Sequence, residues 1–97
     1  MSYLIVWTYD VAPAHRAAFR AAYGPDGDWA LLFKRSAGFV GVELYQDGER
    51  FITLDRWSSK SAFDAFQAAH GGEYAALDVK LAHLTIGQVR IGAFEGA

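Results

Sequence analysis

The sequence predicts an α+β fold, namely a ferredoxin-like unit with a four-stranded antiparallel sheet and helices on one face. Segments with the two-residue alternation of strands and segments with the helical repeat follow one another in the order β-α-(α)-β-β-α-(α)-β. The stretch Phe51–Phe66 runs from a strand through a serine cap directly into an amphipathic helix. A length of 97 residues predicts one domain, over residues 1–97.

The composition is apolar for so short a chain. Hydrophobic residues make up 53% of the sequence, and they include seven Phe, five Tyr and three Trp. One small core cannot easily hide this much apolar material, because a short chain buries only roughly two-thirds of its unfolded surface on folding. We therefore expect an apolar surface that meets a second copy of the chain, most simply in a homodimer.

Charge and cysteine usage exclude several classes of function. The net charge is −2 and no basic patch is present, which argues against nucleic acid as a partner. The chain has no cysteine, so disulfides and thiolate chemistry are excluded. The apolar run Leu4–Val6 is too short to cross a membrane, and the N-terminus lacks a signal-peptide pattern. We expect a cytoplasmic protein that binds no membrane.

The first strand is predicted over Tyr3–Tyr9, where two largely apolar sets of side chains alternate, so the strand should be covered on both faces. Pro13 suits the first position of the helix that follows. On that helix, side chains four residues apart share one face: His15, Phe19 and Tyr23. The sequence Gly24-Pro25-Asp26-Gly27 ends it, and a short second helix begins at Asp26 or Asp28.

A hairpin is predicted from the strands Phe39–Tyr45 and Arg50–Trp57 around Asp47-Gly48. With the turn centred there, Val42 lies opposite Thr53, whereas a three-residue loop would exchange the partners. One face then holds Val40, Val42, Leu44, Phe51, Thr53, Asp55 and Trp57. The other face holds Phe39, Gly41, Glu43, Tyr45, Ile52, Leu54 and Arg56.

The second half of the chain is predicted to contain two helices and a final strand. Ser58 or Ser59 caps a helix that extends from Ser59 to His70. Gly71-Gly72 interrupts the chain, and a further helix covers Glu73–Ala82. The last strand is predicted over Leu84–Phe94, where Gly87 or Gly92 marks a bulge or a close backbone approach.

Several of these residues resemble the antibiotic biosynthesis monooxygenase domain family. The resemblance rests on the element order and on Gly38-Phe39, Asp55-x-Trp57-x-Ser59, Phe63, Phe66 and Glu73-Tyr74-x-x-Leu77. It implies a dimeric α+β barrel, in which two sheets face each other and a ligand pocket lies inside each subunit, between sheet and helices. Members include cofactor-independent monooxygenases that oxidise polycyclic phenols to quinones, haem-degrading enzymes and proteins without known activity.

We expect neither a cofactor nor a metal. The haem-degrading branch of the family uses an asparagine, a tryptophan and an axial histidine at places that fall near Trp7, Phe66 and Asp78, and none of these matches. The three histidines lack a metal-binding spacing, and no phosphate-binding glycine motif follows a strand.

His15 and Tyr74 are the candidate catalytic residues. His15 lies on the apolar stripe of the first helix, so its imidazole is expected to face the sheet and act as a base on a phenol. The alternative is a histidine at the edge of the core. Tyr74 is expected to donate a hydrogen bond to a substrate carbonyl. Asp55 shares a strand face with Trp57, where a buried carboxylate would need a partner, and the alternative is that Asp55 fixes the strand end. The expected walls of the substrate pocket, which could instead be ordinary core, are Trp29, Phe33, Trp57, Phe66 and Asp78.

The leading hypothesis is a cofactor-independent monooxygenase that acts on a small aromatic or phenolic, polyketide-like compound. The first alternative is a non-catalytic dimeric module that binds a small apolar or aromatic ligand, because fold does not imply function. The second is an isomerase or lyase on a polyketide-like substrate, a chemistry that related barrels support.

Overall fold

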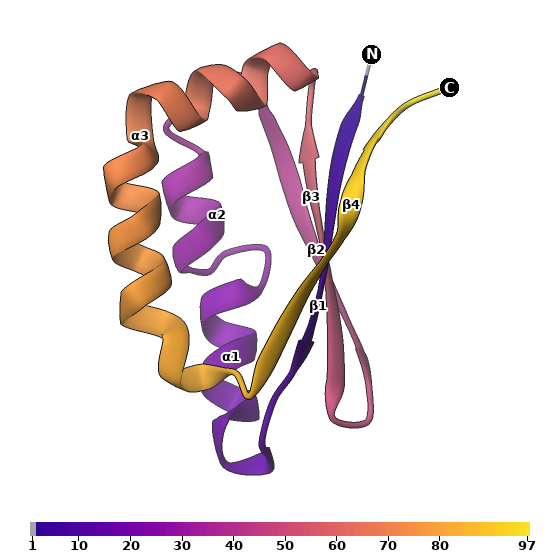
Figure 1. Cartoon of the computed structure of the whole chain (residues 1–97), viewed down its shortest axis with the longest axis vertical. Helices are drawn as coiled ribbons and strands as arrows, with labels where there is room; N and C mark the ends of the chain where they lie inside the picture. The colour runs from indigo at the N-terminus through magenta and orange to yellow at the C-terminus, as the bar shows by residue number, and fades with distance from the viewer. Residues whose placement is uncertain (1) are drawn as a thin grey trace.

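A computed structural model describes residues 2–97 and contains one antiparallel sheet with helices on one face (Figure 1). The strands are β1 (Tyr3–Asp10), β2 (Phe39–Asp47), β3 (Arg50–Trp57) and β4 (Gly87–Glu95). The helices are α1 (Arg16–Tyr23), α2 (Asp28–Phe33) and α3 (Lys60–Leu81), with 3-10 turns η1 (Pro13–His15) and η2 (Ala82–Leu84). The spatial order of the strands is β2-β3-β1-β4, which confirms the predicted ferredoxin-like sheet.

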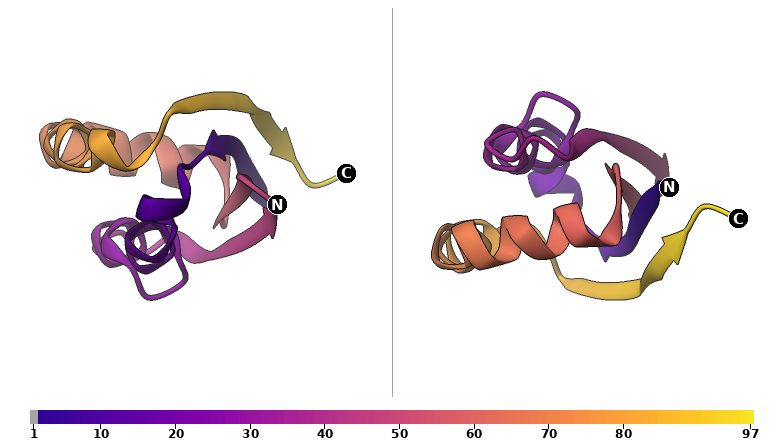
Figure 2. Two further views of the ribbon diagram at one scale, coloured as in Figure 1. Left: turned by 90° about the horizontal axis from the view of Figure 1, so that it is seen from below. Right: turned by 90° about the horizontal axis from the view of Figure 1, so that it is seen from above.

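The helices form two groups on the same side of a curved sheet. Figure 2 shows α1 and α2 in one group and α3 in the other, with the sheet facing both. The central strands β1 and β3 carry the core face, because each has a strand neighbour on both sides. On β1 the buried side chains that point toward the helices are Tyr3, Ile5 and Tyr9.

The hairpin register differs from the predicted one. Asp47 pairs with Arg50, so Gly48 occupies the turn with a positive φ of 60°, which glycine adopts without strain. Val42 therefore lies opposite Asp55 rather than Thr53. The shift amounts to two residues, and since side chains alternate with a period of two, Val42 and the β3 residues keep their predicted face.

A bulge at the start of β2 overturns the predicted faces of two residues. Phe39 pairs with Trp57 and Gly41 with Arg56, so Val40 is an extra residue on its strand. The Phe39 ring consequently packs 5.4 Å from Trp57 in the core, whereas Val40 is 63% exposed. A second irregularity in β4 leaves Ile91 unpaired beside Gly92, one of the two glycines at which we expected a bulge.

The predicted break at Gly71-Gly72 is a kink and does not end the helix. Ser59 caps α3 by accepting a hydrogen bond from the Ala62 amide at 3.1 Å, as predicted. The helix then continues to Leu81 with non-helical dihedral angles only at His70 (φ −127°, ψ 19°). Glu73 holds this kink, because it contacts the His70 ring nitrogen at 2.8 Å and forms a salt bridge with Arg35, just beyond α2.

Two aromatic clusters fill the space between the sheet and the helices. The Trp57 cluster, at one end of β3, consists of Trp57, Phe33, Phe39, Phe63 and Phe66, with ring centroids 5.2–5.4 Å from Trp57. The Phe51 cluster, at the other end, consists of Phe51, Phe19, Tyr9 and Tyr23. Trp29 on α2 bridges them, with its ring 6.1 Å from Tyr23 and 5.8 Å from Phe33.

The close approach of β2 to α3 gives a test of this packing. A Cβ on Gly38 would overlap the Ala62 Cβ and lie 3.0 Å from the Ser58 hydroxyl, whereas a Cβ on Gly41 meets nothing within 4 Å. We expect Gly38→Ala to lower the free energy of unfolding by about 2 kcal/mol, because α3 must move away from the hairpin. Gly41→Ala is the matched control and should change it little in urea unfolding. Equal effects of the two substitutions would contradict the packing described.

Candidate functional site

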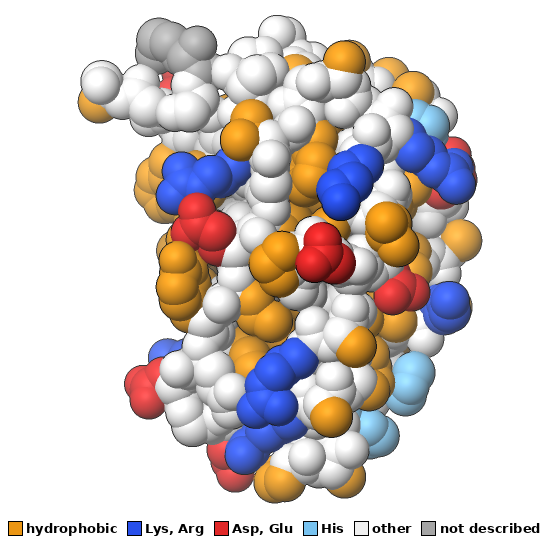
Figure 3. Space-filling view, turned by 180° about the vertical axis from the view of Figure 1, so that it is seen from behind, with side chains coloured by type: hydrophobic (Ala, Val, Ile, Leu, Met, Phe, Trp, Pro, Cys, Tyr) orange, Lys and Arg blue, Asp and Glu red, His pale blue; other side chains and the backbone are white. Residues whose placement is uncertain are grey.

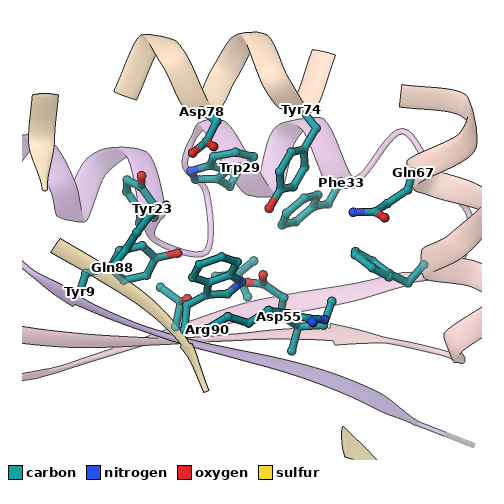
Figure 4. Close-up of a pocket in the computed structure, with 15 residues that line it drawn as sticks. Tyr9, Tyr23, Trp29, Phe33, Asp55, Gln67, Tyr74, Asp78, Gln88 and Arg90 are labelled. Atoms are coloured by element: carbon teal, nitrogen blue, oxygen red, sulfur yellow. The ribbon is translucent and has the colours of Figure 1, made fainter. Parts of the chain in front are cut away.

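A cavity of about 360 Å³ lies between the sheet and the helices (Figure 4). This volume is at the small end of the range for ligand pockets. All four strands contribute side chains, together with all three helices. Its lining residues are Ile5, Trp7, Tyr9, Tyr23, Trp29, Phe33, Val42, Thr53, Asp55, Phe63, Gln67, Tyr74, Asp78, Gln88 and Arg90.

The alternation of side chains along β3 explains the position of the cavity. Four side chains of this strand point toward the helices, and the outer two, Phe51 and Trp57, are buried in the aromatic clusters. The inner two, Thr53 and Asp55, are short and polar, and both line the cavity. The aromatic clusters thus hold the helices away from the sheet at both ends, and the polar middle of β3 forms the floor between them.

Asp55 has apolar neighbours on both sides in the sheet. It lies opposite Ile5 of β1 and Val42 of β2. Burial raises the pKa of the Asp55 carboxyl to about 7, because an apolar environment disfavours the charged form. Both protonation states are therefore populated near neutral pH, as a group that accepts and releases protons requires.

Two hydrogen-bond donors face the cavity from the helices. Burial raises the pKa of Tyr74 on α3 to about 12, so its phenol keeps its proton at neutral pH and can donate it in a hydrogen bond. The indole Nε1 of Trp29 is buried without a hydrogen-bond partner among residues 2–97. The two rings lie 4.8 Å apart, with the Trp29 nitrogen turned toward Asp78 and the Tyr74 hydroxyl toward Asp55 (Figure 4).

Two further tyrosines form one end of the cavity. Tyr9 and Tyr23 belong to the Phe51 cluster, and their rings lie 5.0 Å apart. Burial raises the pKa of both phenols above the ordinary value, so both stay neutral. They supply polar hydroxyl groups without charge to a largely aromatic wall.

The charged lining residues other than Asp55 are exposed. Asp78 of α3 and Arg90 of β4 are both exposed, and each contributes to the lining. Two exposed amides from the same two elements also line the cavity, Gln88 at the end near Asp78 and Gln67 at the opposite end (Figure 4). The exposed part of the lining is thus polar, whereas most of the remaining lining is aromatic.

The structure brings together four of the seven residues proposed from the sequence. Trp29, Phe33, Tyr74 and Asp78 all line the cavity. Trp57 and Phe66 do not, because both have 0% exposure inside the Trp57 cluster. Their part is to support the wall through Phe33, whose ring lies 5.4 Å from Trp57 and 5.2 Å from Phe66.

His15 lies outside the cavity, and the expectation that its imidazole faces the sheet is wrong. The chain begins its helical path as the 3-10 turn η1, with three residues per turn, and α1 starts only at Arg16. The interval of four that places Phe19 and Tyr23 in the core therefore does not extend back to His15, which is exposed. Its ring stacks edge-on at 5.9 Å against that of His83, far from any role as a pocket base.

Sequence reasoning missed several cavity residues, of which Asp55 is the most informative. The sequence did carry a signal for it, since Thr53 and Asp55 interrupt an otherwise apolar strand face between Phe51 and Trp57. Of the two alternatives for Asp55, fixing the strand end does not fit, because Asp55 lies two residues inside the strand and lines the cavity. Tyr9 and Arg90 carried no such signal, because their contribution depends on how β1 and β4 pair.

Within residues 2–97, neither a metal-binding cluster nor a membrane-spanning helix is present. The described part of the chain contains no group of three or more His, Asp or Glu side chains placed to hold a metal ion. None of the helices in this range is long and apolar enough to cross a membrane.

Comparisons with known proteins agree on one family and one fold. Residues 2–71 match the family model described as antibiotic biosynthesis monooxygenase. A point mutant of SnoaB, a cofactor-independent oxygenase from Streptomyces nogalater, superposes with a TM-score of 0.76 at 21% identity, over 98% of this chain and 92% of that one.

Other solved structures give the same result. Unmutated SnoaB has a TM-score of 0.72 at 22% identity, over 99% of this chain and 93% of its own. A candidate antibiotic biosynthesis monooxygenase from Deinococcus radiodurans has a TM-score of 0.72 at 20% identity, over 100% of this chain and 93% of that one. No curated protein sequence matches this chain. Identities of this size establish the shared fold.

The pKa of Asp55 leads to a prediction on stability. In the unfolded chain an aspartate titrates near 3.9. Between that pH and about 7 the folded protein binds a proton that the unfolded chain has lost, so its stability falls as pH rises. Asp55→Asn removes this effect, and we expect it to raise the free energy of unfolding by up to about 4 kcal/mol at pH 8, since the two pKa values differ by about three units.

Urea unfolding of both proteins at several pH values measures this difference. It should be small at pH 4, grow through neutrality and level off above pH 8. Asp64→Asn, at an exposed position of α3, is the control and should show no such growth. A constant difference between Asp55→Asn and the wild type would contradict the assigned pKa.

Proposed function

The chain belongs to the antibiotic biosynthesis monooxygenase family, and on that premise we propose that it oxidises a small phenolic, polyketide-like compound with dioxygen and without a cofactor. The substrate occupies the cavity between sheet and helices. Its neighbour in fold, SnoaB, is a cofactor-independent oxygenase, which supports the same class of reaction.

The observation that carries the proposal is a protonated donor, the Tyr74 hydroxyl, which points into an aromatic cavity (Figure 4). Trp29 Nε1 has no partner among residues 2–97, and the Tyr74 hydroxyl keeps its proton to a pH of about 12. Donors aimed at a developing oxyanion stabilise it most where water is excluded. A phenol that becomes an electron-rich enolate next to such a donor can react with dioxygen directly.

The proposed reaction balances without an added reductant. With an anthrone as substrate, the ring CH₂ group becomes a carbonyl and two C–H bonds break. One oxygen atom of dioxygen forms the new C=O bond, and the other leaves as water with the two hydrogens. The substrate supplies all the electrons, so the protein needs to contribute only binding, proton transfer and electrostatic stabilisation.

Oxygen uptake by the purified protein tests the proposal, with anthrones, naphthols and hydroquinones as probes. We expect uptake above the spontaneous rate with formation of the quinone for at least one probe. Tyr74→Phe should lower kcat/KM by about 10²-fold, because it removes a donor to the oxyanion. His15→Ala is the control and should leave turnover unchanged, since His15 is exposed outside the cavity.

The alternatives make different predictions in the same assays. Product formed in the absence of oxygen would identify an isomerase or lyase. A rise in melting temperature with a probe that is never converted would identify a ligand-binding module. Full activity in Tyr74→Phe would contradict the role given to its hydroxyl.

We also propose that the protein forms a homodimer through the outer faces of its sheets, as in a dimeric α+β barrel. Tyr45, Val89 and Phe94 are each more than half exposed, and all three lie on the face away from the helices. Hydrophobic side chains gather along this sheet side of the molecule, on the left in Figure 3. Arg56 and Glu43 pair at 2.6 Å on the same face, so neither charge needs a partner from a second copy.

Light scattering of two variants tests the dimer. We expect the wild type to have twice the chain mass and Val89→Asp to dissociate it, because a charge would be buried in the interface. Val79→Asp is the matched control, since Val79 is 78% exposed on α3, away from the sheet. A monomeric wild type, or dissociation by Val79→Asp alone, would contradict the proposed interface.

A further inference from the structure

Asp55 brings a carboxyl to a strand position that normally holds an apolar side chain. Its strand, β3, is interior to the sheet, and Ile5 and Val42 flank it on the two neighbouring strands. No salt bridge among residues 2–97 includes this carboxyl. A half-buried carboxyl without a cation still costs free energy, so its place in a cavity wall requires an explanation.

The position of Asp55 relative to Tyr74 explains why a carboxyl lies in the cavity wall. Asp55 lies on the floor of the cavity and Tyr74 on the helix above it, and their polar ends point into the space between them (Figure 4). A ligand in that space has a proton acceptor on one side and a hydrogen-bond donor on the other. This is the arrangement that enolisation of a carbonyl compound requires.

We propose that Asp55 is the catalytic base, which removes the acidic ring C–H proton of the keto form of the phenolic substrate. This inference rests on the proposed function and adds the proton acceptor to it. The carboxylate replaces His15 as the base, since His15 does not reach the cavity.

The proposed step transfers one proton. The C–H bond of the substrate breaks, an O–H bond forms on the Asp55 carboxyl, and the electron pair remains on the substrate as an enolate. The enolate oxygen accepts a hydrogen bond from Tyr74, which stays protonated. Dioxygen, the oxidant of the proposed reaction, then adds at the carbon that lost its proton.

The groups around Asp55 are compatible with this role. Tyr9 of β1, Tyr23 at the end of α1 and Tyr74 of α3 all have raised pKa values, so none of them titrates near neutrality. The β2 neighbour, Val42, is apolar. The charged groups that line the same cavity are Asp78 from α3 and Arg90 from β4, both exposed. The titration of Asp55 should therefore dominate the pH profile of the first step, with an inflection near its pKa of about 7.

Hydrogen exchange without oxygen isolates this step from oxidation. The probe is a hydroxylated anthrone in D₂O under anaerobic conditions, and NMR follows the loss of its ring CH₂ signal. We expect the wild type to accelerate exchange over the spontaneous rate, with a rise through about pH 7 as Asp55 ionises. Asp55→Asn should lower the catalysed rate by about 10²-fold or more. Asp55→Glu should retain part of it with a displaced inflection.

Two controls exclude an indirect effect of the substitution. Asp64→Asn, on the exposed surface of α3, should leave both rate and profile unchanged. Asp78→Asn should keep the inflection near pH 7, because it keeps Asp55. Thermal melting of Asp55→Asn shows that the variant is folded, so a lost rate reflects lost chemistry.

The outcomes separate this inference from the proposed function. Oxygen uptake that persists unchanged in Asp55→Asn would overturn the role of Asp55 and leave the oxygenase intact. Exchange that the wild type accelerates and Asp55→Asn does not, without oxygen uptake by either protein, would overturn the oxygenase and support Asp55 as a base. A wild type that does not accelerate exchange, or an Asp55→Asn variant with the wild-type pH profile, would overturn the inference itself.

Discussion

The packing of aromatic rings at the two ends of β3 determines where this protein can be hollow. Trp57 and Phe51 anchor the two clusters, and both are almost fully buried. Trp29 joins the clusters on the helix side, so α2 is held at a fixed height above the sheet. Because large rings set that height at both ends, the smaller side chains between them cannot reach the helices. The cavity is what remains.

This arrangement also explains how the fold tolerates a carboxyl in an interior strand. An unpaired acidic group is costly in a dry core. Around Asp55, however, the clusters leave a space that solvent or a ligand can enter, while they bury enough apolar surface to offset a local loss. Asp55 and the cavity around it thus lower the stability of the fold and are also the part of the molecule that can perform chemistry. Active-site residues of enzymes often have this cost in stability.

The sequence predicted the sheet, the helices and most of the core, because these depend on local periodicity. The strand faces of β3 were predictable even with the wrong register, since a shift of two residues preserves them. Two kinds of feature escaped prediction. The bulge at Val40 and the 3-10 turn before Arg16 each change the local period, which reversed the assignments of Phe39 and His15. The lining from β1 and β4 depends on pairing between distant strands, which local patterns do not encode.

The kink at His70 divides α3 near the point where the family match ends, at residue 71. The residues before it build the floor and inner wall of the cavity, whereas Tyr74, Asp78, Gln88 and Arg90 all follow it. The two sides of the cavity thus come from segments on either side of one bend in the chain, and β4 returns from the second segment to pair with β1 in the same sheet. A substitution that changes the angle of this bend would therefore change the width of the cavity without altering any residue that lines it.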